Sequence, residues 1–548
     1  MSVVTELVKN IVHSEESKVA ASWGHPERRL GLLEICRAID SVALGAQRDP
    51  ETVDFCRQGA NKAISLFMDE SCKEQRTPLF PSGDATFQWA HSVLQHCGYI
   101  AVCEKFLEYE QAGLGQFVAQ GEDLQFEILP KYAGVEALEE EEFRWLEGSI
   151  SYVQRPIRNL LDSLQPRVHD RMRQLVYVWY DHYIGYGGTP EIDAYFDQQG
   201  VLAAQLMTGH DVFADEAQFG GLPFGFYRAS VWTLVGWALK HVNFALILHE
   251  MHPNLHLQNL VTVTADVDKF TSELAGALQV TTNEASQALC LLEMDLNNST
   301  RLCINGHAAP PLIRAASEQF LKPVAGSLVE PFQFMLRNLR TRYRGDWDRA
   351  VNDREVLFRQ ELLELFPQDW LRKLPKNMNL KSGSQTITDI DAVVLDEKNA
   401  IAGLFQLKWQ DPFGHSMRER TARMKNFQRE ANLWVQAVTE FLAASTEQEI
   451  KRLFGCIKLT RPLECRLFVV GRYFAHFSGE AAPDTRAVWA IWPQLMRLAN
   501  SNSDSKNPVM DLHSSIASDS PFNKRISWSP PSFRVGGKLI TVKTNRSG

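Results

Sequence analysis

Two neighbouring segments with the period of β-strands constrain the fold of this chain most. Thr388 to Leu395 and Ile401 to Trp409 both show this period, and a turn is predicted between them at Asp396 to Ala400. Together the three segments predict a β-hairpin at residues 387–409. The apolar side chains of such a hairpin need neighbouring elements to cover them.

Helical patterns flank the hairpin. Apolar spacing of three and four predicts a helix at Arg354 to Phe366 and a basic helix at 416–444, and strands are predicted at Cys465 to Arg472 and Ala487 to Trp492. The order helix, strands, helix, strand is typical of an α/β domain. We place this domain at residues 341–500, with its boundary within the basic segment around Arg337 to Asp348.

The region before residue 341 has a different pattern. Helical spacing recurs at Glu51 to Met68, Ala85 to Gln111, Glu139 to Leu164 and Val168 to Tyr183. A chain of 548 residues also exceeds what one hydrophobic core organises. We therefore expect a multidomain protein, with a large, mostly α-helical region at 1–340 followed by the α/β domain.

The end of the chain is expected to be a tail. Ser501 to Ser520 is rich in Ser, Asn and Asp, which favours a flexible loop. We assign 501–548 as a flexible tail, although Lys538 to Val542 could add an edge strand.

Membrane and disulfide patterns are weak in this sequence. The longest apolar run, Ala229 to Leu248, contains Lys240, His241 and Asn243, so we expect a buried helix and no membrane contact. The first residues lack the pattern of a signal peptide, which favours the cytoplasm. The nine cysteines contain no CxxC pair and predict reduced, mostly buried thiols.

Charge is unevenly distributed along the chain. Residues 1–340 contain 26 Lys and Arg against 43 Asp and Glu, whereas residues 341–548 contain 31 against 23. Only the C-terminal part therefore has the positive balance that suits nucleic-acid phosphates. The acidic part is better suited to a protein partner, including a second copy of the same chain.

Polar residues gather at the open end of the predicted hairpin. Side chains alternate across a strand, so Asp389 and Asp391 share one face, and Gln406 and Lys408 share a face of the next strand. Pairing around the turn places Asp391 opposite Gln406 or its neighbour and Asp389 opposite Lys408 or its neighbour. Oxygen ligands for a hard cation beside an ammonium group are what metal-assisted phosphodiester cleavage requires.

The preceding helix can supply a further carboxylate. Glu355 falls within the apolar stripe of Phe358, Leu362 and Phe366, whereas Glu361 and Glu364 fall on the opposite flank and are expected to be solvated. A carboxylate on a buried face needs a partner, which could be a metal ion or a nearby arginine. The sequence leaves open whether Glu355 or Glu361 is the helix carboxylate of the site.

Glu355, Asp391 and the sequence Gln406-Leu407-Lys408 resemble the motifs of the PD-(D/E)XK nuclease superfamily, and more narrowly of its Mrr-like restriction endonuclease branch. The resemblance covers residues 345–500 and implies a restriction-endonuclease-like α/β fold. It implies that Asp391, Gln406 and Glu355 bind Mg²⁺ or Mn²⁺ and that Lys408 is the catalytic cation. Gln406 departs from the commoner carboxylate, and no proline precedes either aspartate.

The resemblance also implies an activity, the endonucleolytic cleavage of DNA, and a role of the kind found in bacterial anti-phage defence or restriction. Sequence does not separate DNA from RNA as the substrate, because the phosphate chemistry is shared. A rival interpretation is a non-catalytic protein in which cross-strand ion pairs explain the same residues, and which binds nucleic acid or serves as a scaffold.

The helix predicted after the hairpin has a broad basic face suited to phosphate contacts. Its residues are Arg418, Arg420, Arg423, Lys425 and Arg429. The same residues would also fit an ordinary solvated helix face. For Trp409 and Phe413, core packing is favoured over stacking on a nucleic-acid base.

Overall fold

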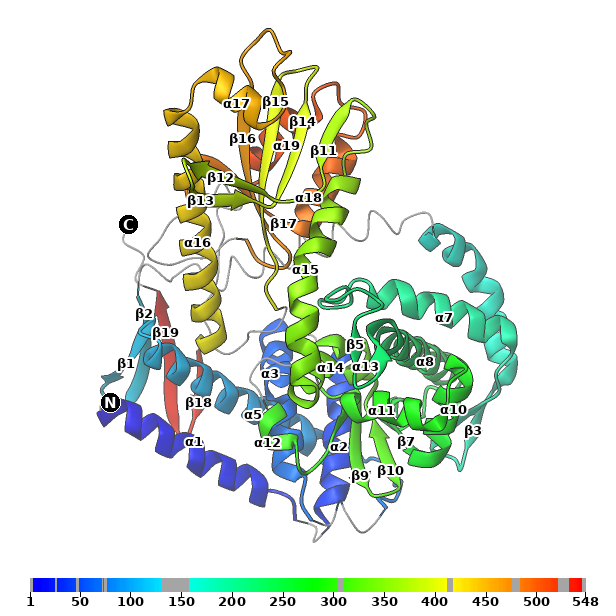
Figure 1. Ribbon diagram of the computed structural model, residues 1–548. Coiled ribbons are helices and arrows are strands. Elements are labelled where there is room, and N and C mark those ends of the chain that lie inside the picture. Colours follow the sequence, from blue (N-terminus) through cyan, green and yellow to red (C-terminus); the bar gives the residue numbers. More distant parts are fainter. Residues whose placement is uncertain are drawn as a thin grey trace.

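The predicted hairpin lies at the centre of a five-stranded mixed sheet in the computed structural model of this protein (Figure 1). The strand order is β11–β14–β15–β16–β17, antiparallel from β11 to β15 and parallel from β15 to β17. The strands are β11 (Leu371–Leu374), β14 (Ala392–Asp396), β15 (Ile401–Lys408), β16 (Glu464–Gly471) and β17 (Ala487–Ile491).

The structure describes residues 3–24, 27–45, 49–70, 72, 76–129, 157–303, 309–411, 417–475, 483–520 and 532–544. Within these ranges, the side chains of 417–426 and 544 lie outside the description. The predicted helix at Glu139 to Leu164 is therefore described only from residue 157, where the chain is helical.

Helices cover both faces of the five-stranded sheet, which explains why β14 is buried along its whole length. One face packs Val394, Phe405 and Phe468 against three helices, and the other packs Val393, Leu404 and Val469 against one long helix and a short one. The covering helices are α15 (Arg344–Glu364), α18 (Trp492–Ser501) and α19 (Pro508–Ser518) on the first face, and α16 (Met417–Ala444) and α17 (Glu447–Leu453) on the second. The predicted order of helix, strands, helix and strand is confirmed.

A second hairpin interrupts the predicted first strand. β12 (Met378–Ser382) pairs with β13 (Gln385–Ile390), and β13 ends immediately before Asp391. The segment that the sequence predicted as one strand is therefore two strands in two different sheets. Asp391 occupies the corner between them.

Helix α15 belongs to two hydrophobic cores. Trp347 and Ala350 in its first half pack into a core of the N-terminal region, whereas Phe358 and Leu362 pack beneath the five-stranded sheet. Figure 1 shows this helix running from one part of the molecule into the other. The helical and α/β parts are therefore connected by a continuous rigid element.

The N-terminal region is mixed, with helices around two four-stranded sheets. The first sheet has the order β1–β2–β19–β18 and the second has the order β7–β10–β9–β8. Around the first lie α1 (Val3–Ala21), α2 (Arg28–Ala43), α3 (Pro50–Phe67) and α5 (Asp84–Gln111), with strands β1 (Gly115–Gln120) and β2 (Asp123–Ile128).

The second part of this region is built around the long buried helix α8 (Phe224–Met251). Its other helices are α7 (Pro190–Ala204), α9 (Gln258–Val261), α10 (Val267–Leu278), α11 (Thr282–Leu292), α12 (Ser299–Leu302), α13 (Val324–Leu328) and α14 (Pro331–Arg342). Its strands are β3 (Val176–Trp179), β4 (Tyr183–Tyr186), β5 (Gln218–Phe219), β6 (Leu222–Pro223), β7 (Val263–Asp266), β8 (Glu293–Met294), β9 (Leu312–Ala316) and β10 (Gln319–Lys322).

The prediction of a flexible tail after residue 500 is wrong for the described residues 508–518 and 532–544. Helix α19 buries Val509, Leu512 and Ile516 against the five-stranded sheet. Strand β19 (Lys538–Thr544) is a central strand and not an edge strand, because it pairs with β2 on one side and with β18 (Ser532–Val535) on the other. Figure 1 shows these two red strands beside the blue strands of the N-terminal region, so the chain returns to its beginning.

The apolar run at 229–248 is a buried helix, as predicted. Among the described residues, α8 alone is long and apolar enough to cross a membrane, and most of its apolar window is buried inside the protein. All nine cysteines are free thiols, of which six are buried, so that prediction is also confirmed.

Candidate functional site

Asp391 and Gln406 face each other at the end of the sheet. Ala392 pairs with Phe405, and the amide of Asp391 donates to the carbonyl oxygen of Phe405 at 3.0 Å. The next pair along the ladder is therefore Asp391 with Gln406, as the sequence predicted. Asp389 departs from the prediction, because the chain leaves this sheet at Asp391 and Asp389 pairs with Asn379 of β12.

The carboxylate of Asp391 is buried, and only one of its two oxygens accepts hydrogen bonds from described residues. Its Oδ2 accepts from Nε2 of Gln406 at 2.5 Å and from the amide of Leu407 at 2.7 Å. No described residue donates to its Oδ1 or to Oε1 of Gln406. Each of the two side chains thus has one acceptor oxygen without a donor from the described part of the chain.

Two further carboxylates lie near Asp391. The pKa of its carboxyl is raised to about 7, mainly by burial and also by the charges of Asp389 and Glu355, whereas the Leu407 amide and Lys408 act in the opposite direction. Asp389 and Glu355 are therefore close enough to act on Asp391 electrostatically, although neither bonds to it. Such a group of carboxylates favours the binding of a cation.

Glu355 is exposed, which corrects the expectation that it lies within the apolar stripe. The inward face of α15 is formed by Trp347, Arg354, Phe358 and Leu362, and Glu355 falls at the border of that face. The physical reason is that the neighbouring Arg354 is buried and occupies the inward position. The spacing of apolar residues did not predict a charged residue there. Glu355 remains the helix residue whose charge acts on Asp391.

Glu361 is not a solvated charge, contrary to expectation. It is half-buried and forms an ion pair with the buried guanidinium of Arg472. This partner follows directly after β16 and could not be inferred from helix periodicity. Because Glu361 is already paired, Glu355 is the better candidate for the helix carboxylate of the site.

Lys408 lies at the end of β15, on the same face of the sheet as Gln406. Its Nζ lies 3.2 Å from a carboxylate oxygen of Glu430 on α16, and 26% of its side chain remains exposed. Sequence reasoning missed Glu430 because the helix was assigned as a basic face. The exposed fraction leaves the ammonium accessible to a ligand.

Arg359 is a second cation that sequence reasoning missed. It lies on α15 one turn after Glu355, and its Nε donates to the backbone carbonyl oxygen of Asp391. The spacing of four residues was the signal that could have placed both side chains toward the same edge of the sheet.

The predicted basic helix is present as α16. The side chains of Arg418, Arg420, Arg423 and Lys425 lie outside the described residues, and Arg429 is exposed. Phe413 also lies outside the described residues. Trp409 packs edge-on against Phe358 with ring centroids 5.5 Å apart, which confirms core packing for that residue.

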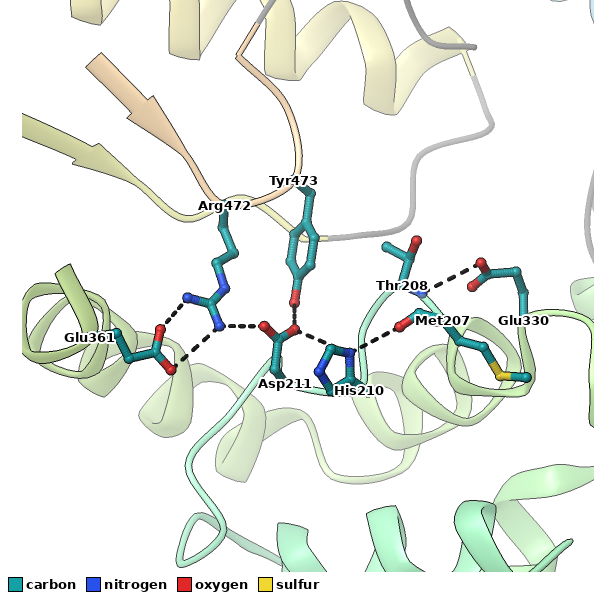
Figure 2. A network of polar contacts seen from close by, with 8 residues as sticks. All are labelled: Met207, Thr208, His210, Asp211, Glu330, Glu361, Arg472 and Tyr473. Carbon is teal, nitrogen blue, oxygen red and sulfur yellow. Dashed lines mark hydrogen bonds and ion pairs between the residues drawn. The ribbon is translucent and has the colours of Figure 1, made fainter. Parts of the chain in front are cut away.

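A network of buried charges lies next to the candidate site (Figure 2). Arg472 contacts Glu361 of α15 and Asp211, which precedes β5 in the N-terminal region. The hydroxyl of Tyr473 donates to Asp211 at 2.8 Å. Burial raises the pKa of Asp211, but the charge of Arg472 outweighs this effect and the net result is a pKa below the ordinary value. Figure 2 shows Asp211 reaching up to Arg472 and Tyr473 from below.

A second buried arginine joins the same two parts. Arg354 forms an ion pair of 2.7 Å with Asp411, three residues beyond Lys408. Its guanidinium also lies 4.2 Å from the ring centroid of Phe213, in the same segment as Asp211. The end of β15 is therefore fixed from both sides by contacts that include the N-terminal region.

The oxygen atoms at this site are of the type that a hard cation prefers as ligands. Asp391 and Gln406 offer oxygens that lack donors, and Glu355 adds a nearby carboxylate. Across the described residues, no group of three or more His, Cys, Asp or Glu side chains is arranged to hold a metal ion. A cation here would therefore take the Gln406 amide and a substrate oxygen as ligands in addition to the carboxylates.

In comparisons with protein-family models, curated proteins and solved structures, no match to this chain was found.

Proposed function

We propose that this protein is a metal-dependent endonuclease that hydrolyses phosphodiester bonds of DNA and uses Mg²⁺ or Mn²⁺. The observation that carries the proposal is the pairing of Asp391 with Gln406 at the end of β15, with Lys408 two residues further along the same face. This arrangement combines oxygen ligands without donors and an accessible ammonium group within one corner of the sheet.

Asp391 and Gln406 would hold the cation, and Glu355 would complete the protein's contribution. When bound, the cation supplies Lewis-acid polarisation of a phosphate oxygen. Lys408 orients the attacking water and stabilises the negative charge that develops on the phosphoryl oxygens as the bond to the leaving sugar oxygen breaks. Glu430, in contact with Nζ, limits the rotamers of Lys408.

The two halves of the chain have different roles in the proposed reaction. The C-terminal half supplies the positive balance for phosphate binding, while the acidic N-terminal region fixes the end of β15 through Asp211 and is suited to contacts with a protein partner or a second copy. We also propose that the protein is located in the cytoplasm and acts in bacterial anti-phage defence or restriction.

The test is a side-by-side incubation of the full chain with plasmid, linear duplex DNA, single-stranded DNA and RNA. Each reaction contains millimolar Mg²⁺ or Mn²⁺, and a matched reaction contains excess chelator. We expect DNA to be cut internally only when the cation is present. Internal cleavage of RNA with DNA left intact would change the substrate class, and no cleavage of any substrate would overturn the proposal.

One set of observations favours a second candidate, a non-catalytic scaffold. Asp391 Oδ2 already accepts two hydrogen bonds, and Lys408 already has a carboxylate partner, so a purely structural cluster would have much the same contacts. In a scaffold, Gln406→Glu would place another buried carboxylate beside Asp391 and destabilise the fold.

Melting curves of wild type and Gln406→Glu, with and without millimolar Mn²⁺, separate the two candidates. The nuclease proposal predicts a rise in Tm on addition of Mn²⁺ that is larger in the variant, because a carboxylate binds the cation more tightly than an amide does. A destabilised variant that does not respond to Mn²⁺ would favour the scaffold.

A further inference from the structure

We propose that Arg359 is a further catalytic residue, which binds a non-bridging oxygen of the substrate phosphate beside Asp391. This inference rests on the proposed nuclease function. Arg359 was not among the residues that the sequence motif indicated, and it enters the site from α15 and not from the hairpin.

The contacts of Arg359 leave most of its hydrogen-bonding capacity unused. Nε donates to the carbonyl oxygen of Asp391, which fixes the guanidinium next to the candidate ligand. Neither terminal nitrogen has a partner among the described residues, and the side chain is half-buried. A guanidinium fixed at Nε keeps both terminal nitrogens available for a planar, two-point contact with phosphate oxygens.

Each of the other three arginines of α15 has a carboxylate partner. Arg344 is paired with Asp348, Arg349 with Asp346, and Arg354 with Asp411. Arg359 has no carboxylate partner within the described part of the chain, although Glu355 lies one turn away on the same helix. A spacing of four residues normally favours an ion pair between such side chains.

The surrounding charges explain what an anion would gain at this position. The negative charges of Asp389 and Glu355 lie near Asp391. They repel an approaching phosphate unless nearby cations offset them. Lys408 approaches from the side of α16 and Arg359 from the side of α15. The two cations therefore reach the Asp391 corner from different sides, and Arg359 is the one that binds an oxygen of the bound phosphate.

A purely structural role would be to tie α15 to the start of β14. In that case loss of Arg359 would lower stability, but it would change neither the number of phosphate contacts nor the response to added guanidinium ions. These two measurements therefore separate a catalytic contact from a structural one.

The experiment compares Arg359→Ala, Lys408→Ala and the control Arg349→Ala in the full chain. Arg349 lies on the same helix with 77% of its side chain exposed. The first readout is single-turnover cleavage of duplex DNA with Mn²⁺, which we expect to fall about 100-fold in Arg359→Ala and to be unchanged in the control. Added millimolar guanidinium chloride is expected to restore part of the rate in Arg359→Ala but not in Lys408→Ala.

The second readout is binding of the same duplex in chelator as the salt concentration rises, which does not depend on cleavage. Arg359→Ala should reduce the slope of log affinity against log salt by about one. Wild-type cleavage and an unchanged slope in Arg359→Ala would overturn the inference, and so would a slow variant with no rescue and an unchanged slope. If wild type cuts no substrate, the proposed function fails and the slope alone decides whether Arg359 binds phosphate.

Discussion

The backbone amide of Arg472 donates to the carbonyl oxygen of Lys408 at 2.9 Å. The proposed catalytic lysine is thereby bonded to the residue whose side chain contacts Asp211 of the N-terminal region and Glu361 of α15. Lys408 is therefore connected to the N-terminal region through the backbone and side chain of Arg472. We infer that the N-terminal region is part of the structural support of the site.

Asp211→Asn should destabilise the protein by about 1 to 3 kcal/mol, because it removes one of two carboxylates from the buried Arg472. Urea unfolding measures the change. The matched control is Glu250→Gln, which removes an ion pair between exposed residues and should cost less than about 1 kcal/mol. Equal effects of the two substitutions would mean that the buried network contributes no more than a surface pair.

Deleting residues 521–548 should destabilise the N-terminal region, because it removes the central strand β19 and the buried side chains Ile540 and Val542. We expect a lower Tm and faster proteolysis between residues 1 and 129. A chain that ends at residue 544 retains β19 and is the control. If the longer deletion melts like the control, the pairing of β19 with β2 makes no contribution to stability.

Asp391→Asn should change how stability depends on pH in the absence of metal. The folded pKa of Asp391 is about 7 against an ordinary value of 3.8, so between these values the folded state keeps a proton that the unfolded state has lost. Wild type therefore loses stability as pH rises from about 4 to about 7, and the variant lacks this loss.

The variant should gain on the order of 1 to 3 kcal/mol relative to wild type between pH 4 and pH 8. Melting curves in chelator at both pH values measure it. Parallel pH profiles for the two proteins would show that Asp391 is not held protonated by its surroundings.

Features set by local pattern could be predicted from the sequence. The register of Asp391 opposite Gln406 follows from the turn at Asp396 to Ala400, because a hairpin of fixed turn length allows one pairing. Strands β16 and β17 and the buried helix α8 also have local signals. Each depends on periodicity within a single element.

Features set by distant partners could not be predicted. Periodicity placed Glu355 inward because it did not anticipate that Arg354 would be buried by Asp411 and the rings of Phe213 and Trp409. The contacts of Lys408 with Glu430 and of Arg472 with Asp211 join residues whose proximity is set by tertiary packing. The pairing of β19 with β2 in the first sheet also depends on tertiary packing between distant parts of the chain.

Metal-dependent DNA cleavage by Lys408→Ala, measured beside Lys381→Ala, tests whether this corner of the sheet is the active site. Lys381 is an exposed lysine on β12 and serves as the control. We predict that Lys408→Ala loses at least about 100-fold in single-turnover rate, while its melting temperature and its affinity for duplex DNA stay close to those of wild type. Lys381→Ala should cleave like wild type. Cleavage by Lys408→Ala at the wild-type rate would contradict the assignment of this corner of the sheet as the active site.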